Sequence, residues 1–110
     1  WIVRNNSDLF EDIKGCKQSI GLTNNPTAFI THEIDLNTGD CVYIFTDGYS
    51  DQFGGPKGKK FKSRAFKKLL QSVYSEPINQ QKDIIETTMK TWKGKLEQVD
   101  DICVIGLKVN

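Results

Sequence analysis

The stretch Cys41-Val-Tyr-Ile-Phe-Thr46, followed directly by Asp47-Gly-Tyr-Ser-Asp51, decides most of what can be predicted about this chain. An apolar run rich in β-branched and aromatic residues, bounded by turn-forming residues, is typical of a strand buried on both faces. Asp47 and Asp51 are then expected at the rim of a sheet, where rigid oxygen ligands can hold a hard cation. Asp-Gly after a strand is also the commonest tight-turn signal, and from these residues alone a plain turn is the more frequent meaning.

Length and composition indicate one globular domain with a modest core, since the chain has 110 residues, of which 37% are apolar and 26% charged. No apolar run approaches the roughly 20 residues of a membrane span, so we expect no membrane contact by this segment. The net charge is +1, so an acidic partner would have to recognise local clusters of lysine. Cys16, Cys41 and Cys103 have no metal-ligand or redox spacing and are expected to be buried thiols in a reducing compartment.

The first residues predict a β-hairpin, with strands at 1–3 and 9–13 and a turn at 5–8. The chain begins inside the first of these strands, and its one methionine is Met89. We therefore expect it to be a piece of a longer protein, in which case any site that it carries is incomplete.

The next segment predicts a loop and then a strand. Residues 15–26 have loop composition, with Ile20 and Leu22 as expected anchors in the core. Residues 28–36 alternate between apolar and polar side chains, which is typical of a half-buried strand, and we expect this strand to pair antiparallel with the one at 41–46. His32 lies on its apolar face and is expected to be a hydrogen-bonded structural residue, the usual state of a buried polar group.

After Pro56 the pattern changes to helices. Basic residues alternate with apolar ones at three- and four-residue spacing and predict an amphipathic helix with a solvated basic face, which ends before Pro77. A second helix is predicted from Ile78 or Asn79 to Gly94, a natural helix-ending residue. The basic residues are Lys57, Lys59, Lys60, Lys62, Arg64, Lys67 and Lys68.

A second acidic pair, Asp100-Asp101, begins a closing strand predicted at 99–109 and apolar enough to be central. If this strand and the one before Asp47 are antiparallel neighbours, their acidic groups meet at one rim. Clustered carboxylates repel each other without a cation and favour magnesium, manganese or calcium, whereas the absence of cysteine or histidine ligands argues against zinc. In isolation, Asp100-Asp101 is equally well explained as a turn or capping pair.

Three segments in combination resemble the stage II sporulation protein E-like branch of the metal-dependent (type 2C, PPM) serine/threonine phosphatases. They are residues 45–61, the two-helix insert that ends in Trp92-Lys-Gly94, and residues 97–106. The resemblance covers nearly the whole chain and implies an α+β fold, part of an α/β/β/α sandwich of antiparallel sheets with two helices between the two acidic strands. An early aspartate-glycine motif of the family has no counterpart here. Residues 1–110 are therefore expected to be the C-terminal portion of a single phosphatase domain.

The resemblance also implies roles for the acidic residues. By position, Asp47 and Asp100 would be metal ligands, Asp51 would lie near a weaker additional metal site, and Asp101 is a less favoured ligand. The implied cofactors are two Mn²⁺ or Mg²⁺ ions in the complete domain, which would turn a shared water into a hydroxide in line with the phosphorus. The isolated chain is expected to be inactive, because the remaining ligands are missing.

The expected function of the parent protein is that of a cytoplasmic phosphoserine/phosphothreonine phosphatase in bacterial partner-switching signalling. Its substrate would be a phosphoprotein such as an anti-sigma-factor antagonist, with Lys59, Lys60 and Lys62 as candidate docking residues. Exposed sheet edges would allow self-association. The alternative is a non-catalytic module that binds an acidic partner or nucleic acid through residues 57–68, but no stacking or base-reading motif supports nucleic acid.

Overall fold

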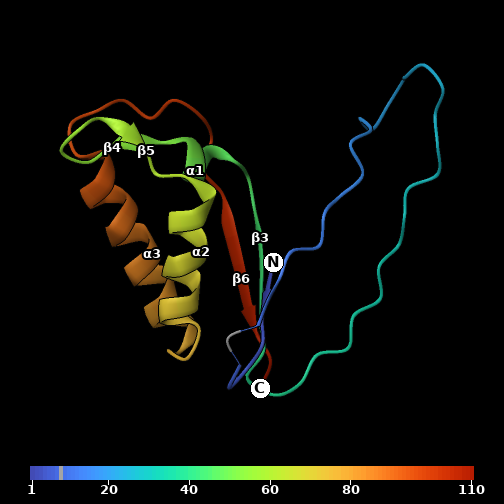
Figure 1. Ribbon diagram of the computed structural model, residues 1–110, viewed down its shortest axis with the longest axis horizontal. Helices are drawn as coiled ribbons and strands as arrows, with labels where there is room; N and C mark the ends of the chain where they lie inside the picture. Colours follow the sequence, from blue (N-terminus) through green and yellow to red (C-terminus); the bar gives the residue numbers. More distant parts are fainter. Residues whose placement is uncertain (8) are drawn as a thin grey trace.

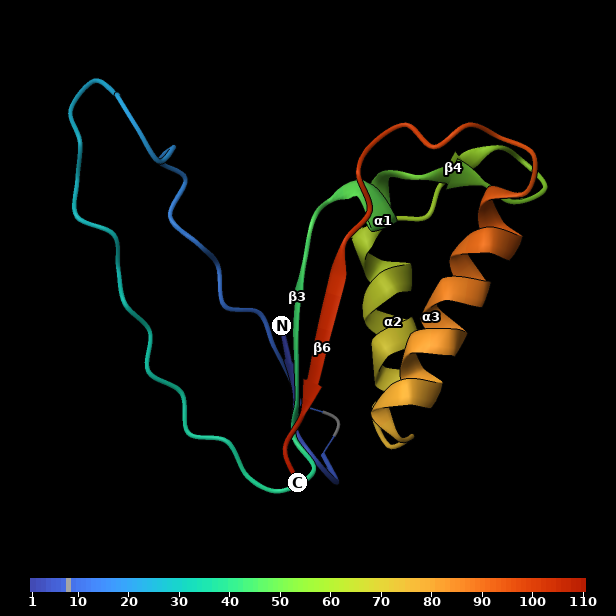
Figure 2. The ribbon, with the colours of Figure 1, turned by 180° about the vertical axis from the view of Figure 1, so that it is seen from behind.

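The computed structural model describes residues 1–7 and 9–110 and has an α+β fold, as predicted. Its elements are β1 (Ile2–Val3), β2 (Phe10–Glu11), β3 (Cys41–Phe45), α1 (Gly48–Asp51), β4 (Phe53–Gly54), β5 (Lys59–Lys60), α2 (Ser63–Val73), α3 (Ile78–Lys93) and β6 (Val104–Lys108). Four strands form an antiparallel sheet of order β2-β1-β3-β6, and β4 pairs with β5. Helices α2 and α3 cover one face of the sheet, and a long arm between β2 and β3 extends from its other side (Figures 1 and 2).

Strand β3 is the organising strand, as predicted, with β1 on one side and β6 on the other. Cys41 and Tyr43 point toward the helices and are at most 1% exposed, whereas Ile44 is 65% exposed. The prediction of burial on both faces is therefore wrong. The helix layer covers one face only, and within the described ranges the face that carries Ile44 is open.

The closing strand differs from its prediction in length and position. It begins at Val104, after the acidic pair, and it lies at the edge of the sheet formed by the described residues. Ile105 and Leu107 are accordingly more than half exposed, at 59% and 54%. Their apolar character reflects the open sheet face, to which both side chains belong together with Ile44.

The two helices pack their apolar stripes onto the sheet, as their periodicity predicts. Phe66 and Leu70 of α2 are fully buried, and Ile85 and Met89 of α3 are at least nine-tenths buried. Helix α3 spans the predicted residues and ends at Gly94, whose φ of +54° suits glycine. Neither helix, nor any other in the described part of the chain, is long and apolar enough to cross a membrane.

The first helix begins later than predicted, because residues 53–60 form the hairpin β4-β5. Gly55 and Gly58 have positive φ values of +70° and +57°. Such values allow a tight turn and are incompatible with a right-handed α-helix. Lys62, with φ of +74°, then separates the hairpin from α2. The early lysines of the basic stretch therefore lie on a hairpin and not on a helix face.

The arm between β2 and β3 is the largest departure from the sequence-based expectations. Residues 28–36 form no strand, His32 is exposed, and Ile20 and Leu22 are almost fully exposed instead of anchored in the core. At the start of β3, where residues 28–36 were expected to pair, β1 and β6 occupy the two edges of the strand. The predicted pairing of 28–36 with β3 is thus wrong.

The cysteines also differ from expectation. Cys41 is buried as predicted, whereas Cys16, on the arm, and Cys103, just before β6, are exposed. All three are free thiols. The exposure of Cys16 follows from the extended arm, and that of Cys103 from its place beside the open edge of the sheet.

A buried carboxylate, Asp40, ties the start of β3 to the first hairpin. It is 2% exposed and accepts hydrogen bonds from the backbone N–H groups of Asn5 (2.8 Å) and Asn37 (2.9 Å) and from the Arg4 guanidinium (2.9 Å). These bonds, the backbone ones first, lower the pKa of Asp40 to about 2.

Replacement of Asp40 by asparagine should destabilise the fold in a pH-dependent way. Because the pKa is lowered in the folded state, the stabilisation is complete above about pH 4 and is lost as the pH falls toward 2. Denaturant midpoints of Asp40→Asn and the parent should therefore differ at pH 7 and converge near pH 2. Asp35→Asn, an exposed change in the same region, is the control, and a pH-independent difference for Asp40→Asn would contradict the prediction.

Candidate metal centre

Thr46 joins the end of β3 to the segment that precedes β6. Its backbone N–H donates to the Cys103 carbonyl (3.0 Å), and its hydroxyl donates to the Asp101 carbonyl (2.8 Å) while it accepts from the Cys103 N–H (3.1 Å). The side chain thus extends the β3-β6 ladder beyond the last regular pair. This is the rim at which the sequence predicted that the two acidic segments meet, and the antiparallel pairing on which that prediction depended is confirmed.

Gly48 brings the two segments into backbone contact. A Cβ atom at this position would lie 2.2 Å from the Asp101 carbonyl oxygen, far inside any tolerated contact. The glycine that follows Asp47 is therefore required by the close approach of the Asp101 backbone. A tight turn alone would not impose this requirement.

Asp47 occupies the N-cap position of the one-turn helix α1, but its carboxylate makes no capping hydrogen bond. The backbone carbonyl of Asp47 instead accepts from the Asp51 N–H (2.9 Å) and the Ser50 hydroxyl (3.1 Å). The side chain is exposed at the rim. The backbone is thus fixed while the carboxylate remains available to a ligand.

Asp100 and Asp101 are both exposed and lie in the loop before β6, so the strict alternation of a strand does not govern their side chains. One carboxylate oxygen of Asp100 accepts from the N–H of Asp101 at 2.7 Å. The position of Asp101 is fixed through its backbone, by Thr46 and Gly48. Asp101 is thereby placed as a support for the rim as well as a candidate ligand.

The chemistry of these donors suits magnesium, manganese or calcium, since the side chains offered at the rim are carboxylates. They are too few for a complete site, because no group of three or more His, Cys, Asp or Glu close enough to hold a metal occurs within residues 1–7 and 9–110. The chain fits part of a coordination shell.

Asp51, the residue expected near a weaker metal site, lies at the end of α1 and forms an ion pair with Lys60 at 3.4 Å. The Lys60 ammonium also lies 5.8 Å from the centroid of the Phe53 ring. Lys59 lies beside it on β5, Lys62 lies just before α2, and all three lysines are exposed. Two of the candidate docking lysines are thus on the hairpin that follows α1, and the third, Lys62, joins that hairpin to α2.

Residues that the sequence did not single out hold this segment in place. Gln52 is fully buried, and its amide donates to the Glu97 carbonyl (2.8 Å), which links α1 to the loop that carries the acidic pair. The backbone carbonyl of Gln52 accepts from the Trp92 indole N–H (3.0 Å). Tyr49, in α1, is also buried, at 1% exposed. These contacts are tertiary, so no spacing rule could have found them. The one signal in the sequence that pointed to a buried contact here was the aromatic Tyr49 between Asp47 and Asp51.

The helices and antiparallel strands form an α+β fold of the PP2C-like class. The chain belongs to the stage II sporulation protein E (SpoIIE) family, whose model matches residues 1–110. Among solved structures it is similar to the SiaA-PP2C domain of Pseudomonas aeruginosa, with 30% sequence identity and a TM-score of 0.71 over 76% of this chain. The match covers 34% of that chain, so the present chain spans about a third of its length. No match was found among curated proteins.

Gly48→Ala should force the two acidic segments apart. A Cβ at 2.2 Å from the Asp101 carbonyl requires a backbone shift, and overpacking of this kind costs about 1–3 kcal/mol. The free energy of unfolding from denaturant titration of the complete domain should fall by that amount. Gly15→Ala is the matched control, since nothing lies within 4 Å of its added Cβ. Equal stability of the two variants would show that the close approach is not required.

Proposed function

We propose that the protein to which this chain belongs is a phosphoserine/phosphothreonine protein phosphatase that depends on Mn²⁺ or Mg²⁺. The observation that carries the proposal is the Thr46 bridge, which holds the Asp47 segment against the Asp100-Asp101 segment in a chain of the SpoIIE family. A family of PP2C-type domains is generally metal-dependent, and the donors at this rim are oxygens.

Asp47 and Asp100 would hold the metal ions, which when bound acidify a water and neutralise charge on the phosphoryl oxygens. The backbone of Asp47 is fixed by the strand end and by α1, so the direction in which its side chain leaves the backbone is set. Thr46 and Gly48 hold the Asp101 backbone against that segment and so set the spacing of the two acidic groups. Lys60 offsets the charge of Asp51 beside them.

The substrate in this proposal is a phosphoprotein of bacterial partner-switching signalling, such as an anti-sigma-factor antagonist, and the reaction takes place in the cytoplasm. The support is the SpoIIE family membership and the basic hairpin. Lys59, Lys60 and Lys62 are exposed near the acidic rim, where cationic side chains attract a phosphorylated, acidic segment. The hairpin is therefore the surface that we assign to substrate docking.

Three single substitutions in the complete domain test the metal assignment. Asp47→Asn and Asp100→Asn should lower the Mn²⁺-dependent hydrolysis of a phenyl phosphate ester by at least about 100-fold, beyond the loss expected for a residue that merely orients a ligand. Asp101→Asn should retain most of the activity, because Asp101 is held through its backbone. Circular dichroism should be unchanged in all three. If Asp101→Asn were as inactive as Asp100→Asn, the site would have to be rebuilt around Asp101.

The docking role of the hairpin predicts a split between substrates. Charge reversal of Lys59 and Lys62 to glutamate, with Lys60 kept because it pairs with Asp51, should lower kcat/KM for a phosphoprotein roughly tenfold or more, since it removes electrostatic attraction, and should leave the small ester unaffected. Reversal of Lys14 and Lys17, which are exposed on the arm, is the control of equal charge. Equal loss on both substrates would mean that the change damages the site or the fold.

A further inference from the structure

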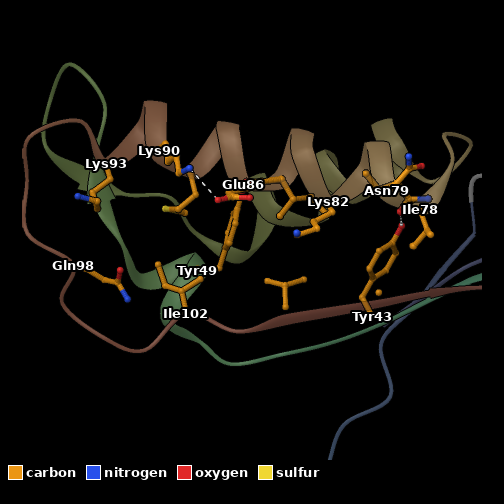
Figure 3. A pocket seen from close by; sticks show the side chains of 15 residues that line it. Tyr43, Tyr49, Ile78, Asn79, Lys82, Glu86, Lys90, Lys93, Gln98 and Ile102 are labelled. Atoms are coloured by element: carbon orange, nitrogen blue, oxygen red, sulfur yellow. Dashed lines mark hydrogen bonds and ion pairs between the residues drawn. The ribbon is translucent and has the colours of Figure 1, made fainter.

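Two buried tyrosines connect the rest of the core to α3, and both line the same cavity of about 850 Å³ beneath that helix (Figure 3). Tyr43 lies on β3 and Tyr49 on α1, and each is 1% exposed. Burial raises the pKa of both hydroxyls, so both remain protonated donors at neutral pH. The two residues are matched in type, burial and target helix, and they differ in which part of the fold they anchor.

Tyr49 anchors the segment that carries Asp47. It lies two residues after Asp47, and its hydroxyl donates to the Ile85 carbonyl in the middle of α3 at 2.7 Å. Its ring stacks on Phe66 of α2 with centroids 4.3 Å apart and an interplanar angle of 19°, and meets the edge of Phe61 at 5.4 Å. A helix of one turn has little stability of its own, so the position of α1 depends on such contacts.

Trp92, near the end of α3, holds the other end of the same segment. Its indole N–H donates to the Gln52 carbonyl (3.0 Å), and its own carbonyl accepts from the Gly55 N–H (2.8 Å). A Cβ at Gly54 would lie 2.0 Å from that carbonyl. Residues 47–55 are thus attached to α3 at two points, and Tyr49 is the one nearer to Asp47.

Tyr43 makes an equivalent bond with a different consequence. Its hydroxyl donates to the side-chain oxygen of Gln81 at 2.6 Å, one helical turn before Ile85. The Gln81 amide in turn donates to the carbonyls of Tyr74 (3.1 Å) and Glu76 (2.9 Å) in the turn between α2 and α3. Tyr43 therefore fixes the end of the helix pair that is remote from the acidic rim, and its own backbone is held in the ladder opposite Gly106.

We propose that Tyr49 is a positioning residue for Asp47. By bonding to α3, Tyr49 fixes where α1 lies, and α1 in turn fixes the place of the metal-binding carboxylate of Asp47. The inference rests on the proposed function, because Asp47 is there assigned to the metal. In this arrangement the position of the Asp47 carboxylate depends on the position of α3. The Tyr49 hydroxyl bond then contributes to metal affinity, and the equally buried Tyr43 bond contributes to stability alone.

The experiment compares Tyr49→Phe with Tyr43→Phe in the complete domain, since each change removes one hydroxyl and keeps the ring. Mn²⁺ affinity is measured by calorimetry and by the electron paramagnetic resonance signal of free Mn²⁺, and Tm by circular dichroism. Loss of one hydrogen bond that supports the bound state should weaken Mn²⁺ binding about 3- to 10-fold in Tyr49→Phe. Both variants should lower Tm to a similar extent, since each loses one buried hydrogen bond. Tyr43→Phe should nevertheless bind Mn²⁺ with the affinity of the parent. At saturating Mn²⁺, Tyr49→Phe should recover the parent's kcat.

Two results would overturn the inference, and they are distinguishable. If the parent binds Mn²⁺ and hydrolyses phosphate esters but the two variants have the same Mn²⁺ affinity, Tyr49 is a structural residue only and the proposed function stands. If the parent domain neither binds Mn²⁺ nor hydrolyses the ester, the proposed function fails and the positioning role fails with it.

Discussion

The acidic end of this molecule depends on the two hydrogen bonds made by the Thr46 hydroxyl. The regular pairing of β3 and β6 ends at Phe45 and Val104, and beyond it one backbone bond, from the Thr46 N–H to the Cys103 carbonyl, joins the two segments. The Thr46 hydroxyl strengthens this junction by donating to the Asp101 carbonyl and accepting from the Cys103 N–H. Two carboxylate-bearing loops, which would otherwise repel each other, are thereby held at one rim.

The second constraint comes from glycines, because they lack a Cβ atom. Gly48 and Gly54 each allow a backbone carbonyl, of Asp101 and of Trp92 respectively, to approach where a side chain would stand. The short segment between these glycines is clamped on one side by the acidic loop and on the other by α3. The organisation of the rim is therefore set by backbone contacts over a few residues, and the helix layer beneath supplies its rigid support.

Local sequence signals were sufficient where an element is determined by its own residues. Such signals predicted the apolar run of β3, the extent of α3 and the helix end at Gly94, whereas the meeting of Asp47 with the Asp100-Asp101 segment was predicted only on condition that their strands pair antiparallel. Local signals failed where the outcome depends on a partner. Residues 28–36 have the pattern of a strand but find both edges of β3 occupied. The contacts of Tyr49, Gln52 and Trp92 have no sequence period, because they join residues that come together only in the folded chain.

The arm between β2 and β3 leaves the sheet and returns to it at almost the same place. Glu11, where it departs, is paired with Arg4 at 2.7 Å, and Arg4 and the returning Asn37 both bond to Asp40. The two ends of the arm are thus joined by one small cluster of charged side chains, at the opposite end of β3 from the acidic rim. For a loop whose ends are already fixed, each doubling of length adds only about 0.6 kcal/mol of closure entropy. Evolution could therefore lengthen or shorten this arm, and engineers could insert a reporter into it, with little thermodynamic effect on the strand that carries Asp47.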